Sequence, residues 1–203
     1  MLSRLSPATT TDNVYAIVLA AGASKRLGTL KQLARWKNQT LLEHALQKLR
    51  SLLAERVIVV LGAHAVTIQA AVALDAVTTV VNNDWRQGVA SSLRAGIETL
   101  PPSASAVLIL LCDQPLISVA QLQTLLAAWQ NESDRIVASE YSMSVGVPAL
   151  FPAEFFPALR KLEGDQGAKR LLKEYAAKVI KISLPEAELD IDTPDDFDYL
   201  TGL

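Results

Sequence analysis

"VYAIVLAAGASKRLGTLKQL", residues 14–33, opens with an apolar run of seven residues and continues into a loop with two glycines and three basic residues. A strand that is apolar at every position, rather than at alternate positions, is typical of a parallel sheet covered on both faces. Ligands of such sheets bind at the carboxyl ends of the strands. The stretch therefore predicts a buried first strand, residues 14–20, followed by a ligand-binding loop.

The rest of the chain alternates between strand and helix patterns. Further strands are predicted at residues 56–62, 77–81, 106–112, 135–140, 145–150 and 178–183. Helices are predicted at residues 40–54, 64–74, 89–99, 118–129, 165–176 and 194–200. Two of these helices begin with capping-box spacing, Thr40 with Glu43 and Ser118 with Gln121. The alternation predicts a three-layer α/β fold, with a Rossmann-like, doubly wound and mostly parallel sheet.

Composition narrows the classes of function. The chain has 203 residues, half of them apolar, and 19 Lys and Arg against 21 Asp and Glu, a formal net charge of -2. This balance argues against a nucleic-acid or membrane-surface partner. No apolar stretch approaches the ~20 residues of a membrane helix. A single cysteine and the absence of a signal-peptide pattern predict a cytoplasmic protein. We expect residues 1–13 to be a flexible leader and residues 14–203 a single domain.

The loop after the first strand fits neither of two familiar phosphate-binding motifs. Five residues separate Gly22 from Gly28, and Thr29 follows Gly28, so the spacing matches neither a dinucleotide fingerprint nor a P-loop. Both glycines allow positive φ and a nest of backbone N–H groups around an anion, to which Arg26 and Lys31 add charge. A polyphosphate suits this arrangement. The alternative is a surface loop whose basic residues are merely solvated.

Carboxylates follow two other predicted segments. Asp113 comes directly after the strand 106–112, where a carboxylate near bound phosphate can hold Mg²⁺. Asp190 and Asp192 share one face of "DIDTP" if that segment is extended. The alternatives are a turn-forming role for Asp113 and a helix-capping role for the later pair.

Six segments in order resemble one family. The first is "LAAGASKRLGTLK"; the others are "NNDWRQGVASSLRAGI" (82–97), "LCDQP" (111–115), "GVPALF" (146–151), "GDQGAK" (164–169) and "DIDTPDDF" (190–197). Together they resemble the molybdenum cofactor cytidylyltransferase-like (MocA/MobA-like) nucleotidyltransferases, from about Val14 to Leu200. The resemblance implies the fold of the nucleotide-diphospho-sugar transferases.

The resemblance also implies an activity. It is Mg²⁺-dependent transfer of CMP from CTP to a phosphate-bearing acceptor, molybdopterin, with release of pyrophosphate. Because such an acceptor is already an anion, the reaction needs positioning and charge neutralisation rather than a general base. Arg26, Lys31 and Asp113 would be the catalytic residues, and Asp113 and Asp192 the metal ligands. The nucleotide-binding residues implied are Ala20, Ala21, Gly22, Ser24, Arg26, Gly28, Lys31, Gly88 and Ser92.

Several points stay open at this stage. "ASSLRAGI" resembles cytidylyltransferases more than guanylyltransferases, which favours CTP over GTP. Val147 stands where the cytidylyltransferases often have His or Asn, so a sugar phosphate or alditol phosphate remains an alternative acceptor. Asp165 and Lys169 either close over the substrate or belong to the start of a helix, and Trp85 is a candidate for stacking on the base. A non-catalytic helper that binds molybdenum cofactor for a partner molybdenum enzyme is the other alternative, and whether Asp190 also binds metal is undecided.

Overall fold

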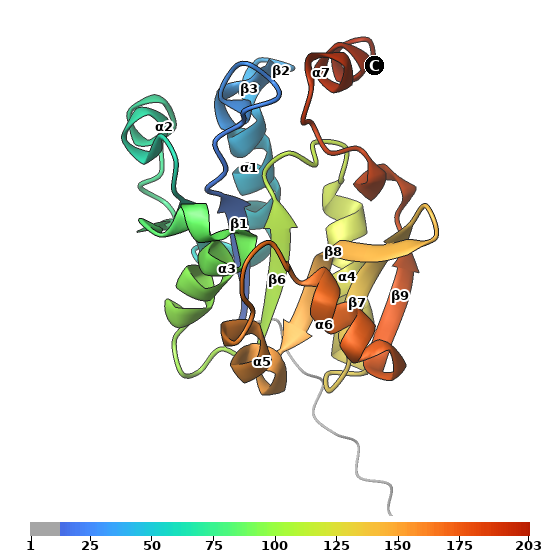
Figure 1. Cartoon of the computed structure of the whole chain (residues 1–203). Coiled ribbons are helices and arrows are strands. Elements are labelled where there is room, and N and C mark those ends of the chain that lie inside the picture. Colours follow the sequence, from blue (N-terminus) through green and yellow to red (C-terminus); the bar gives the residue numbers. More distant parts are fainter. Residues whose placement is uncertain (1–12) are drawn as a thin grey trace, which may run out of the picture.

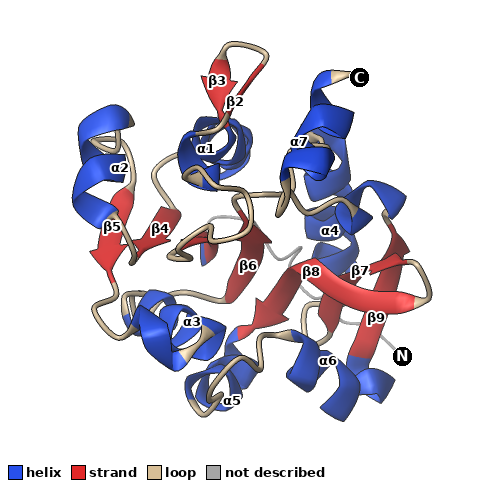
Figure 2. Ribbon diagram, turned by 45° about the horizontal axis from the view of Figure 1, so that its top comes forward, coloured by secondary structure: helices blue, strands red, loops and turns tan. Residues whose placement is uncertain are grey.

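A computed structural model describes residues 13–203. Its centre is a seven-stranded sheet in the order β5-β4-β1-β6-β8-β7-β9, in which only β8 is antiparallel to its neighbours (Figures 1 and 2). The strands are β1 (Val14–Ala20), β4 (Val57–Leu61), β5 (Thr78–Val81), β6 (Ala106–Leu111), β7 (Ile136–Tyr141), β8 (Ser144–Pro152) and β9 (Val179–Ser183). The predicted mostly parallel α/β sheet is confirmed.

Helices cover both faces of this sheet. One face carries α1 (Leu41–Leu53), α2 (Ala65–Ala71) and α4 (Val119–Asn131), and the other carries α3 (Val89–Glu98), α5 (Phe156–Arg160) and α6 (Lys169–Glu174). The side chains of β1 show why the strand is apolar throughout. Val18 packs into the core with α1, whereas Ile17 packs into the core with α3, and both are fully buried. Because successive side chains of a strand point to opposite faces, β1 contributes to the hydrophobic core on each side of the sheet.

The helix starts follow the predicted capping chemistry. Thr40 begins α1 and Ser118 begins α4, each with the reciprocal capping box that its sequence spacing predicts. Thr193 likewise caps α7 (Pro194–Thr201), with Asp196 completing the box. The fully buried side chain of Leu200 packs α7 against Leu27 of the glycine loop, which brings the end of the described chain beside its first loop.

Some elements differ from the sequence expectation. The predicted helix 165–176 begins only at Lys169, and residues 164–168 form a loop instead. β7 and β8 pair as an antiparallel hairpin, and the sequence likewise predicts no helix between residues 140 and 145. A small hairpin of β2 (Arg35–Trp36) and β3 (Gln39–Thr40) was not anticipated. Apart from Asn13, the predicted leader 1–13 lies outside the described residues. No helix in residues 13–203 is long and apolar enough to cross a membrane.

Candidate active site

The sheet aligns two loops at one edge. Leu19 of β1 pairs with Leu111 of β6, and the backbone N–H of Cys112 donates to the Leu19 carbonyl at 3.3 Å. The glycine loop and Asp113 therefore leave neighbouring strands at the same level. This is the carboxyl edge at which parallel sheets place their ligands.

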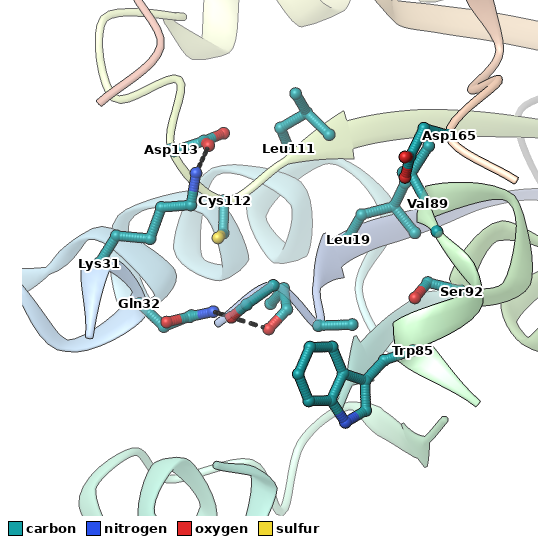
Figure 3. Close-up of a pocket in the computed structure, with 14 residues that line it drawn as sticks. Leu19, Lys31, Gln32, Trp85, Val89, Ser92, Leu111, Cys112, Asp113 and Asp165 are labelled. Atoms are coloured by element: carbon teal, nitrogen blue, oxygen red, sulfur yellow. Dashed lines mark hydrogen bonds and ion pairs between the residues drawn. The ribbon is translucent and has the colours of Figure 1, made fainter. Parts of the chain in front are cut away.

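A buried amide fixes the shape of the glycine loop. The Gln32 side chain, which is inaccessible to solvent, donates from Nε2 to the carbonyls of Ala20 at 2.9 Å and Gly22 at 2.8 Å (Figure 3). Its Oε1 accepts from the Ser24 hydroxyl at 3.2 Å, and Ser24 Oγ accepts from the backbone N–H of Lys31 at 3.0 Å. The predicted phosphate contact Ser24 is thus already bonded within the loop, so it shapes the loop.

The two glycines of the loop have different conformations. Gly28 has φ +77°, whereas Gly22 does not use the positive φ that glycine allows. A Cβ at Gly22 would meet no atom within 4 Å, which leaves open space in front of its backbone. Within the described residues, no backbone N–H from Gly22 to Gly28 donates to another backbone group. These donors remain available to an anion, as a nest requires.

Three distant segments converge on Lys31. The N–H of Ile191 donates to the Asp113 carbonyl at 3.0 Å, which holds the segment 190–192 beside β6. The Lys31 ammonium contacts the Asp113 carboxylate and lies 2.8 Å from Asp192 Oδ1, while Arg26 pairs with Asp192 Oδ2 at 2.5 Å. Burial opposes the charge of Lys31, but the two carboxylates outweigh it and raise its pKa above the ordinary 10.5. The predicted cation and the predicted metal ligands are therefore one cluster.

The same cluster keeps unused acceptor capacity. Asp113 Oδ1 and Asp190 Oδ1 are buried and have no hydrogen-bond partner among the described residues. Burial, and then the charge of Asp113, raises the pKa of Asp190 to about 6. Within residues 13–203 no three His, Cys, Asp or Glu side chains gather as a metal site by themselves. Mg²⁺, however, takes one or two carboxylates and fills its shell with phosphate oxygens and water. Asp113 Oδ1, which has no hydrogen-bond partner among the described residues, lies in the cluster where Lys31 contacts Asp113 and Asp192. This oxygen is a suitable ligand for such an ion.

The polar residues at the start of α3 form the other end of the site. Asn82 Nδ2 donates to the hydroxyls of Ser91 at 2.8 Å and Ser92 at 3.0 Å, so the Ser92 proton remains free to bond a ligand. Gly88 has φ +100°, and a Cβ there would lie 2.3 Å from the carbonyl of Gly164. This close approach of two backbones is sufficient reason for glycine at position 88, whatever its contact with a base.

Some of these groups line a cavity of about 280 Å³. Its walls include the predicted residues Ala20, Ala21, Gly22, Lys31, Gly88, Ser92 and Asp113, together with Gln32, Trp85, Cys112 and Asp165. The predicted residues Ser24, Arg26, Gly28 and Asp192 lie outside this lining. The Arg86 guanidinium covers one face of the Trp85 ring, 4.4 Å from its centroid. Burial raises the pKa of the Cys112 thiol, which remains protonated.

Sequence reasoning missed Gln32 and Asn82. Both are amide side chains between predicted strands and helices, where no periodicity distinguishes a buried amide from a solvated one. The one available signal was their position within segments already singled out, Gln32 in 14–33 and Asn82 in 82–97.

Comparison with known proteins identifies the family to which the chain belongs. The MobA-like NTP transferase domain family matches residues 16–179. Nicotine blue oxidoreductase of Paenarthrobacter nicotinovorans is 32% identical over 89% of this chain and 92% of its own. Purine catabolism protein PucB of Bacillus subtilis is 30% identical over 92% and 95%. Molybdenum cofactor cytidylyltransferase of Escherichia coli is 23% identical over 91% and 93%.

A solved structure is similar over almost the whole chain. Rv0371c of Mycobacterium tuberculosis superposes with a TM-score of 0.83 at 32% identity, covering 96% of this chain and 100% of that one. A second structure of Rv0371c is a complex with manganese, and it superposes with a TM-score of 0.81 at 30% identity. The chain therefore belongs to the MobA-like NTP transferase family, as a nucleotidyltransferase with relatives in molybdenum cofactor synthesis.

Proposed function

We propose that this protein transfers CMP from CTP to a phosphate-bearing acceptor, molybdopterin, and releases pyrophosphate. The observation that carries the proposal is the cluster of Lys31, Asp113 and Asp192 beside an open glycine loop. An anionic acceptor needs no general base, so the site has to hold the triphosphate in line and neutralise its charge.

The glycine loop and the cluster of Lys31, Asp113 and Asp192 have different roles in this reaction. The N–H groups from Gly22 to Gly28, which donate to no backbone group of residues 13–203, bind the β- and γ-phosphates, and the exposed Arg26 closes over them. Lys31 lies on the α-phosphate and stabilises the charge that develops as pyrophosphate leaves. Asp113 and Asp192 would hold Mg²⁺, which supplies charge neutralisation at the phosphate oxygens when bound.

The base lies at the start of α3. We assign the Ser92 hydroxyl and the backbone at Gly88 to the base and ribose, and the exposed part of Trp85 to stacking. CTP rather than GTP is supported by the likeness of "ASSLRAGI" (90–97) to cytidylyltransferases. The cytidylyltransferase of Escherichia coli among the relatives supports the same assignment.

The test is pyrophosphate release by the full chain with CTP, MgCl₂ and molybdopterin. We expect release only when all three are present, and we expect Asp113→Asn to lose at least about 10²-fold in rate, as other charge-stabilising sites do. Asp75→Asn, an exposed carboxylate in a distant loop, is the matched control and should keep the rate. Thermal unfolding of both variants checks that the fold is retained.

Two outcomes would overturn the proposal. One is full turnover by Asp113→Asn. The other is oxidation or reduction of nicotine blue, as the name of one relative suggests, together with no pyrophosphate release from any triphosphate. Tight CTP binding without any turnover would indicate the helper role instead.

A further inference from the structure

The buried amide of Asn82, directly after β5, has one possible orientation. Its Oδ1 accepts a hydrogen bond from the backbone N–H of Asp84 at 2.9 Å, so its Nδ2 faces the hydroxyls of Ser91 and Ser92. A flipped amide would place Nδ2 against the Asp84 N–H, donor against donor. Both protons of Nδ2 are therefore donated to the two serines.

These two serines differ in what their own protons do. Ser91 Oγ donates to the carbonyls of Gly88 at 2.8 Å and Asp84 at 3.0 Å. Ser92 Oγ accepts from Asn82, but no group in residues 13–203 accepts the Ser92 proton. Both side chains are buried, and of the two only Ser92 lines the cavity, on the side that also holds Trp85 (Figure 3). A ligand that accepts this proton satisfies a buried donor.

The bond from Asn82 sets the direction of the next one. Because a proton of Nδ2 occupies a lone pair of Ser92 Oγ, the hydroxyl meets a ligand most favourably as a donor. On its Watson–Crick edge cytosine presents two acceptors, O2 and N3, whereas guanine presents N–H donors at N1 and N2. A fixed donor at this point of the cavity therefore favours the cytosine edge.

We propose that Asn82 is a positioning residue for base selection, which holds the Ser92 hydroxyl as a donor toward an acceptor atom, O2 or N3, of a cytosine. The inference rests on the proposed function for the nucleotide, and it deepens that proposal by naming the residue that sets the choice of base. Its readout is binding in the absence of acceptor. Selective CTP binding without pyrophosphate release when molybdopterin is added would refute the proposed reaction and leave this inference standing.

The test compares the affinities for CTP and GTP, measured by calorimetry with MgCl₂ and no acceptor. We expect the native protein to bind CTP more tightly. Ser92→Ala should weaken CTP binding by about fivefold, as for the loss of one neutral hydrogen bond, and leave GTP binding within about twofold. Ser91→Ala is the matched control. It removes the other hydroxyl bonded to Asn82, but one that does not line the cavity, so it should keep the ratio of the two affinities.

Asn82→Asp reverses the direction of the bond. A carboxylate accepts where the amide donates, so the Ser92 proton turns toward it and the lone pairs of Oγ face the base. At pH 8 the ratio of CTP to GTP affinity should fall by about tenfold or more. The added charge acts on both triphosphates alike and cancels in this ratio. In a Ser92→Ala background the same substitution should leave the ratio unchanged.

A purely structural role of Asn82 gives a different result. Equal losses of CTP and GTP affinity in Asn82→Asp would overturn the proposal, as would an unchanged ratio in Ser92→Ala or a native protein that binds GTP as tightly as CTP. Thermal unfolding checks that each variant is folded. If Asn82→Asp does not fold, Asn82→Ala removes the donor without a buried charge and should lower the ratio by about threefold; an unchanged ratio there would equally refute the role of Asn82.

Discussion

At the scale of single residues, Gly22 is a position where an effect on folding can be measured separately from an effect on ligand binding. Its φ is not positive and a Cβ there would meet open space, so Gly22→Ala should change the free energy of unfolding by less than about 1 kcal/mol. If phosphate approaches this backbone, the added methyl should weaken CTP binding by tenfold or more. Urea unfolding and CTP titration on the same variant measure the two effects. Unchanged CTP affinity would remove Gly22 from the site.

The Lys31 ammonium lies between the carboxylates of Asp113 and Asp192. Lys31→Met should leave the buried Asp113 carboxylate without its cation, whereas Asp192 keeps its pair with Arg26, so the change should cost about 3 kcal/mol of stability at neutral pH. Millimolar MgCl₂ should then raise the Tm of the variant more than that of the native protein. Lys25→Met, which removes an exposed lysine of the same loop, is the matched control. A variant that is destabilised but insensitive to MgCl₂ would argue against metal at these carboxylates.

Residue type and position explain which site residues could be predicted. Lys31 is a charged side chain of the predicted ligand-binding loop, Asp113 follows a predicted strand and Asp192 precedes a predicted helix, and the structure brings all three together. Gln32 and Asn82 act through buried hydrogen bonds that depend on tertiary contacts. Nothing in their neighbouring sequence specifies such burial, so pattern reasoning could not find them.

At the scale of elements, a lysine joins α1 to the loop after β6. Lys48 Nζ donates to the Pro115 carbonyl at 2.6 Å, and burial lowers its pKa from 10.5 to about 8. Between pH 8 and 10.5 the unfolded chain therefore binds a proton that the folded chain does not, so the contribution of Lys48 to stability rises with pH. The full rise is roughly 3 kcal/mol.

Comparison of the native protein with the Lys48→Met variant isolates the contribution of Lys48 to the pH dependence of stability. The native protein should gain stability relative to the variant as the pH rises from 8 to 10.5, measured by urea unfolding at each pH. Burial of the Cys112 thiol, which acts in the opposite direction above about pH 9, is common to both proteins and cancels. A difference that stays constant over this range would show that Lys48 titrates normally.

The elements themselves were largely predictable from periodicity. The strand 14–20 coincides with β1, and the strand predicted at 106–112 is one residue longer than β6. These strands are apolar on both faces because each face has its own core, a property visible in the sequence. The helix predicted at 165–176 starts four residues late because Gly164 has to meet Gly88, more than seventy positions away. Local patterns do not contain that contact.

At the scale of the whole molecule, the site is assembled by topology. The central position of β1 between β4 and β6 places the glycine loop beside Asp113. The last described segment then returns over this edge, where Ile191 and Leu200 pack with Leu27 and bring Asp192 to Lys31. Binding of a metal-nucleotide complex should therefore stabilise segments from both ends of the described chain.

Ligand-induced stabilisation is the corresponding measurement. At a CTP concentration 100 times Kd, linkage adds about 2.7 kcal/mol, which for a chain of this size is a rise in Tm of about 5–10 °C. We expect this rise with CTP and MgCl₂, a smaller one with GTP, and little with CTP when EDTA is present. Asp192→Asn should lose most of the rise, whereas Asp75→Asn should retain it. A larger rise with GTP than with CTP would reassign the base, and an equal rise in EDTA would show that nucleotide binds without the metal that Asp113 and Asp192 are expected to hold.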